Sequence, residues 1–116
     1  MTRVLVVDDD PHVREILIQR LRGRRYQAEG AGNGAEAMAK IDRDAYDVVL
    51  LDLVMPGVSG SQVARELDSR AGAPPYIIIS GVSGPWHRYH PGQKPVAIVE
   101  KPIDFEKLMS AIKGCS

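Results

Sequence analysis

The chain has 116 residues, which is enough for one domain and too short for two domains with separate cores. Its 15 basic residues balance its 15 acidic residues, so the basic excess typical of a nucleic-acid-binding surface is absent. The single cysteine, Cys115, excludes an internal disulfide. No apolar stretch approaches the roughly 18 residues that a membrane span needs. We therefore expect one domain, residues 1–116, in the reducing cytoplasm, without direct nucleic-acid binding or membrane insertion.

Five segments along the chain predict strands. Four of them are continuous apolar runs rich in β-branched residues, which is typical of strands covered on both faces of a parallel sheet. The remaining segment, residues 26–31, mixes polar and apolar side chains, so we place it at an edge of the sheet. In chain order the predicted strands are residues 4–7, 26–31, 48–51, 76–79 and 96–99.

Four amphipathic helical patterns alternate with these strands. Their expected N-caps are Asp10, Asn33, Ser59 and Asp104. Asn33 and Ser59 are each followed three residues later by Glu or Gln, as in a capping box. The stretch 81–95 breaks the alternation, because its three prolines and three glycines leave room for one or two helical turns at most. The pattern predicts an α/β fold, a doubly wound five-stranded parallel sheet with a shortened or irregular fourth helix.

Polar residues stand where four of the strands end. They are Asp8 and Asp9, Asp52, Ser80 and Lys101. The carboxyl ends of parallel strands form the ligand site of such sheets, so we expect these side chains to converge. Single aspartates commonly cap turns and helices, but this many polar residues at four strand ends favours a functional site.

The chemistry of these side chains indicates a cation and phosphoryl transfer. Carboxylates about 4 Å apart repel each other by roughly 1 to 4 kcal/mol, so three of them need a cation. All the donors are oxygens, which favours magnesium (Mg2+) over zinc. A hydroxyl and an ammonium group beside it suit phosphoryl transfer, with Asp52, alone on its strand end, as the nucleophile.

Four motifs in order along the chain resemble a known family. They are VVDDD at 6–10, LLDLVMPGVSG at 50–60, IS at 79–80 and KP at 101–102. Together they are similar to the receiver domain of two-component response regulators, of the chemotaxis-regulator-like kind. The resemblance covers nearly the whole chain and implies a flavodoxin-like sheet with strand order 2-1-3-4-5.

The resemblance also implies a function and roles for individual residues. Asp52 would accept a phosphoryl group from the phosphohistidine of a sensor histidine kinase or phosphotransfer protein, which would change a surface that binds a downstream protein. The chain would be a switch that catalyses only its own phosphotransfer and dephosphorylation, and not an enzyme in the usual sense. The implied magnesium ligands are Asp8, Asp9, Asp52 and the main-chain carbonyl of Val54; Ser80 would be the switch hydroxyl, Lys101 its charge partner, and the Lys101–Pro102 bond would be cis.

Two departures from the family pattern leave other functions open. Ile98 stands where many receivers have a tyrosine or phenylalanine, and the irregular stretch 81–95 replaces a helix of the usual output face. One alternative is therefore a receiver-like scaffold that binds a partner without regulation by phosphorylation. Another alternative, suggested by Asp8 and Asp10 two residues apart after a strand, is an aspartate-nucleophile phosphatase of the haloacid dehalogenase type. That family has threonine or valine where His12 stands, and it needs a cap or larger core that 116 residues do not supply. Metal-dependent phosphorylation of Asp52 and turnover of phosphate esters distinguish the three.

Overall fold

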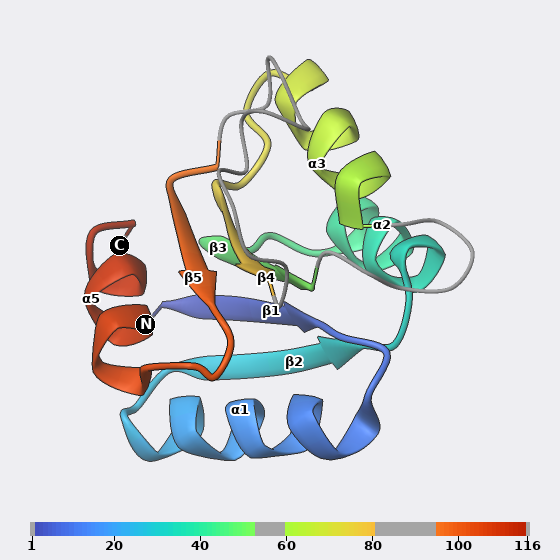
Figure 1. The fold of residues 1–116 in the computed structure, drawn as a ribbon. Helices are drawn as coiled ribbons and strands as arrows, with labels where there is room; N and C mark the ends of the chain where they lie inside the picture. The colour runs from blue at the N-terminus through green and yellow to red at the C-terminus, as the bar shows by residue number, and fades with distance from the viewer. Residues whose placement is uncertain (1, 53–59, 81–94, 116) are drawn as a thin grey trace.

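The computed structural model of the chain describes residues 2–52, 60–80 and 95–115, with the backbone only for Ser61 and Ser80 (Figure 1). Five parallel strands form one sheet in the order β2-β1-β3-β4-β5, which is the predicted order. The strands are β1 Arg3–Val7, β2 Gln27–Ala31, β3 Val48–Asp52, β4 Tyr76–Ser80 and β5 Ala97–Glu100. The helices are α1 Pro11–Gly23, α2 Gly34–Arg43, α3 Gly60–Ser69 and α5 Phe105–Lys113.

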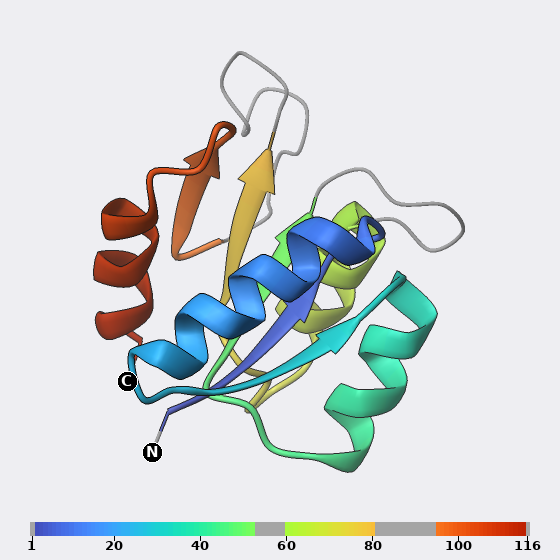
Figure 2. The same ribbon diagram turned by 90° about the horizontal axis from the view of Figure 1, so that it is seen from below.

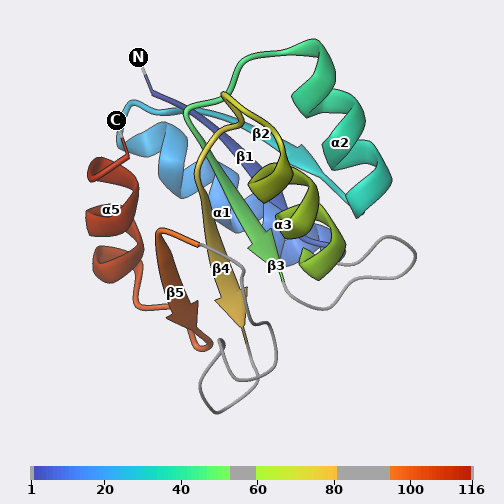
Figure 3. The ribbon, with the colours of Figure 1, turned by 90° about the horizontal axis from the view of Figure 1, so that it is seen from above.

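The sheet has a hydrophobic core on each face, and this explains the continuous apolar runs. Successive side chains of a strand point to opposite faces, so Val4 and Val6 pack with α1 and α5, whereas Leu5 and Val7 pack with α2 and α3. Figure 2 shows α1 and α5 on the first face, and Figure 3 shows α2 and α3 on the second. Strands β1 and β3 therefore need apolar side chains at every inner position, as predicted.

The predicted helix starts are confirmed where the structure describes them. The carboxylate of Asp10 accepts hydrogen bonds from the N–H groups of His12 and Val13, and Asp104 caps α5 in the same way. Asn33 accepts from the N–H of Glu36 at 2.8 Å. The Glu36 carboxylate accepts from the N–H of Gly32, one residue before the cap, so the expected capping box is shifted by one residue. The predicted cap Ser59 lies outside the described residues.

The two edges of the sheet differ from each other. Strand β2 is at one edge, as its mixed composition predicted. At the other edge, Val96 does not belong to the strand: β5 begins at Ala97, and Val96 is 54% exposed. The prediction that this run is covered on both faces was wrong at Val96, which precedes the first residue of β5 and is not covered by the hydrophobic core.

The remaining expectations on the fold concern the fourth helix and the membrane. The segment 81–94, where we expected a shortened or irregular helix, lies outside the described residues. Within the part of the chain that is described, no helix combines the length and the apolar character needed to cross a membrane.

Candidate functional site

The register of the sheet brings the polar strand ends to one edge. Val7 of β1 pairs with Leu51 of β3, so Asp8 and Asp52 follow at the same level on adjacent strands. On the other side of β3, Asp52 pairs with Ile79 of β4. The predicted convergence of residues from several strands therefore follows from the backbone pairing.

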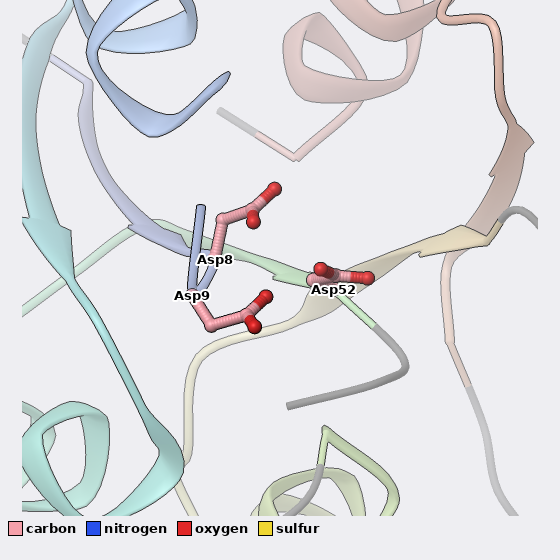
Figure 4. A group of neighbouring side chains, drawn as sticks. All are labelled: Asp8, Asp9 and Asp52. Carbon is pink, nitrogen blue, oxygen red and sulfur yellow. The ribbon is translucent and has the colours of Figure 1, made fainter. Parts of the chain in front are cut away.

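Three carboxylates meet at this edge. Asp8 and Asp9 follow β1, Asp52 ends β3, and each offers an oxygen such that the three oxygens lie within 4.8 Å of one another (Figure 4). Asp8 and Asp52 are buried, with 2% and 6% of their surface exposed, whereas Asp9 is exposed. The cluster is thus open to solvent through Asp9 and closed by the core behind Asp8 and Asp52.

Asp8 is held in place and is electrostatically unfavourable as an anion. Its main-chain N–H donates to the carbonyl of Ala31, and its Oδ1 accepts from the N–H of Asp10 at 2.9 Å. Its Oδ2 is buried and has no hydrogen-bond partner among the described residues. The pKa of Asp8 is raised to about 6, chiefly by burial and also by the nearby charge of Asp52, against the lowering effect of the hydrogen bond from Asp10.

Lys101 brings a positive charge to the cluster. Its Nζ lies 3.5 Å from Oδ1 of Asp52, although Lys101 follows β5 and Asp52 ends β3. The lysine side chain is 38% exposed and that of Asp52 only 8%, so the ion pair lies at the mouth of the cluster. The Lys101–Pro102 bond is cis, in agreement with the resemblance.

Two of the predicted site residues are not placed by side-chain geometry. Ser80 is the last residue of β4 and pairs with Glu100 of β5, and only its backbone is described. Val54 lies outside the described residues. Of the predicted set, the structure therefore brings together Asp8, Asp9, Asp52 and Lys101.

Arg14 also belongs to this region, although no sequence motif predicted it. The guanidinium Nη1 of Arg14, in the first turns of α1, donates to the main-chain carbonyl of Asp8 at 2.7 Å. An arginine in an amphipathic helix normally indicates a solvated face, so the helical periodicity did not distinguish Arg14 from a solvent-facing residue. The glycines at 30 and 32, over which the side chain passes, are the signal that could have been noticed.

The donor set of the cluster fits a hard divalent cation. The candidate ligands are carboxylate oxygens, which suit magnesium and not the softer transition metals. The buried Oδ2 of Asp8 is an acceptor that a cation would satisfy. Within the described part of the chain, the one ammonium group paired with the cluster does not balance its three carboxylates, which favours binding of a further positive charge.

Comparison with known proteins shows the family. The model of the response regulator receiver domain matches residues 4–113. Among curated relatives, the positive alginate biosynthesis regulatory protein of Pseudomonas aeruginosa is 39% identical over 116 residues, which cover 97% of this chain and 46% of that protein. Protein PilH of Pseudomonas aeruginosa is 34% identical over 118 residues, covering 98% of this chain and 97% of PilH. The chain belongs to the response regulator receiver domain family.

Solved structures agree with this assignment. The response regulator protein TrrA of Thermotoga maritima, in complex with Mg(2+)-BeF, is 33% identical, covers 100% of both chains and has a TM-score of 0.87. TrrA in complex with the histidine kinase ThkA superposes with a TM-score of 0.85 at 33% identity, covering 99% of this chain and 98% of that chain. Several curated relatives are longer than this chain. The matched residues span 46% of the positive alginate biosynthesis regulatory protein, and 34% and 30% of two further relatives, RegX3 and ResD.

Proposed function

We propose that this chain, residues 1–116, acts as a single receiver domain and is a phospho-acceptor switch. In this proposal Asp52 takes a phosphoryl group from the phosphohistidine of a sensor histidine kinase or phosphotransfer protein, in a magnesium-dependent reaction. The observation that carries the proposal is the buried Asp52 carboxylate, which lies beside Asp8 and Asp9 and 3.5 Å from the ammonium of Lys101. Receiver domains are signalling switches and not classical enzymes.

The chemistry follows from the positions of the side chains. An oxygen of Asp52 attacks the phosphorus, the new O–P bond forms as the N–P bond of the donor breaks, and the electron pair returns to the imidazole nitrogen. Lys101 lies where its charge offsets that of the transferred oxygens. A magnesium ion held by Asp8, Asp9, Asp52 and the carbonyl of Val54 would supply further positive charge at this place.

The partners and the output are part of the same proposal. A histidine kinase is the donor that the ThkA–TrrA complex supports by similarity. The switch hydroxyl would be Ser80, which ends β4 next to the acceptor strand, and the downstream partner would be a protein. Cytoplasmic location and the lack of direct nucleic-acid binding stay predictions, since some longer relatives are named DNA-binding or transcriptional regulators.

Phosphorylation can be tested by intact-protein mass spectrometry after incubation with acetyl phosphate or phosphoramidate, with and without magnesium. We expect the unaltered chain to gain one phosphoryl group only when magnesium is present, because the carboxylate cluster needs a cation before it can accept a dianionic phosphoryl group. Asp52→Asn should show no gain, since an amide oxygen is a far weaker nucleophile than a carboxylate.

The matched control is Asp42→Asn, which removes an exposed carboxylate of α2 that pairs with Arg70. This variant should be phosphorylated like the unaltered chain. A gain that persists in Asp52→Asn would contradict the assignment of the acceptor. The absence of any gain in the unaltered chain would reject the switch and favour the unregulated scaffold.

A further inference from the structure

We infer that Arg14 is a positioning residue that holds the magnesium ligands Asp8 and Asp9 in the geometry the cation requires. This inference rests on the proposed function and deepens it. Its basis is the hydrogen bond of 2.7 Å from Nη1 of Arg14 to the main-chain carbonyl of Asp8. That carbonyl belongs to the peptide that joins the two carboxylate-bearing residues.

The hydrogen bond fixes more than one atom. A peptide group is planar, so holding the Asp8 carbonyl also fixes the orientation of the Asp9 N–H and the start of Asp9. The N–H of Asp8 is held by Ala31 on β2, and its Oδ1 is held by the N–H of Asp10. With Arg14 on the carbonyl, the buried Oδ2 is the acceptor of Asp8 left for a cation.

The surroundings of Arg14 are shaped to admit its side chain. A Cβ at Gly30 would lie 2.9 Å from Cδ of Arg14, and a Cβ at Gly32 would lie 3.3 Å from its Nη1. Gly30 is near the carboxyl end of β2 and Gly32 directly follows it, so a side chain at Gly30 would force Arg14 and Ile18 to shift, and one at Gly32 would press on the guanidinium of Arg14. The main-chain N–H of Arg14 is bonded to the carbonyl of Asp10 at the start of α1, which ties the other end of the residue to the same turn.

Arg14 has two opposing effects on a bound cation, and we expect the orienting effect to be the larger. Its positive charge repels magnesium, but its guanidinium donates a hydrogen bond to a main-chain carbonyl and so orients the residues that carry the carboxylates. Its orienting effect acts on two of the ligands at once. Groups that orient metal ligands typically contribute about 10-fold or more to metal affinity, so we expect loss of Arg14 to weaken binding.

The experiment compares magnesium binding by isothermal titration with magnesium chloride in four variants. Arg22→Met is the control, because Arg22 lies on the same helix and donates the same kind of bond, at 2.9 Å, to the carbonyl of Ala28 near the other end of β2. We expect Arg14→Met to weaken magnesium binding about 10-fold, and Arg22→Met to leave it unchanged. Arg14→Lys, which keeps the charge and one donor, should recover part of the affinity.

Gly32→Ala is the fourth variant, because it crowds the guanidinium of Arg14 without changing any charge. It keeps the inference testable if Arg14→Met does not fold. It should weaken binding in the same direction. Equal binding by Arg14→Met and Arg22→Met, or tighter binding by Arg14→Met, would overturn the role of Arg14 alone. Failure of the unaltered chain to bind magnesium would overturn the metal site of the proposed function, and this inference with it.

Discussion

Asp8→Asn is expected to raise the free energy of unfolding of the cation-free protein at pH 7.5 by about 1 to 3 kcal/mol. The upper value corresponds to the rise in the pKa of Asp8 from 3.8 to about 6. Asparagine keeps an oxygen for the N–H of Asp10 and removes the buried charge that desolvation and Asp52 oppose. Urea denaturation followed by circular dichroism, in the presence of a chelator, measures the difference.

The same substitution should change the dependence of stability on pH. Because the pKa of Asp8 is higher in the folded than in the unfolded state, the folded state binds the proton more tightly. The contribution of Asp8 to stability therefore falls as pH rises from about 4 to about 6, and the penalty is fully present above that range. Asp8→Asn lacks this decline, so the two stability profiles should separate between pH 4 and 6; parallel profiles would contradict the assignment.

Magnesium should offset most or all of the advantage of the variant. A ligand that binds only the folded state stabilises it by about 2.7 kcal/mol at 100 times its dissociation constant, and the variant lacks one of the proposed ligands. The control is Asp10→Asn, two residues away, because asparagine caps a helix about as well as aspartate. Loss of that exposed charge should lower stability by less than about 1 kcal/mol through the helix dipole. A similar magnesium response in Asp8→Asn and the unaltered chain would contradict the proposed role of Asp8.

Leu50→Ala is expected to lower the free energy of unfolding by about 2 to 5 kcal/mol. Leu50 lies on the central strand β3 with none of its surface exposed, and it pairs with Val6 on one side and Ile77 on the other. Removing its side chain leaves a cavity between the sheet and the helices α1 and α5, because neighbours on a central strand cannot close in. Thermal unfolding should show a Tm lower by roughly 10 °C or more.

Ile16→Ala is the matched control, because it removes the same number of carbon atoms from a residue that is 41% exposed. Its effect should be below about 1 kcal/mol, as for most surface substitutions. Equal losses in the free energy of unfolding for the two substitutions would contradict the assignment of Leu50 to the buried core and of Ile16 to the exposed surface of α1.

Much of the fold could be predicted because burial on each face of the sheet requires apolar residues at alternate positions of the strands. Runs such as residues 48–51 are apolar throughout because alternate side chains enter different cores. The polar composition of β2 identified an edge. The prediction that Val96 is a covered strand residue was wrong. An apolar residue next to an edge strand cannot be distinguished from a strand residue by its type, and the two differ only in exposure.

The site was predictable to the extent that chemistry depends on position along a strand. Asp8, Asp9, Asp52 and Lys101 stand at strand ends, and parallel pairing brings such ends together. Arg14 could not be recognised from its position along a strand, because its contact is made with a main-chain carbonyl, and the glycines at 30 and 32 are the one indirect signal of it. Such contacts depend on the distance between a helix and a turn, which only coordinates supply.

The ion pair between Lys101 and Asp52 has a mechanical consequence. Strand β4 separates β3 from β5, so the two residues start two strand spacings apart, or about 10 Å. The lysine side chain therefore reaches across the carboxyl end of β4 to the carboxylate of Asp52. We expect a group added to Asp52 to displace Lys101 and thereby act on the end of β5, without any change in the register of the strands between them.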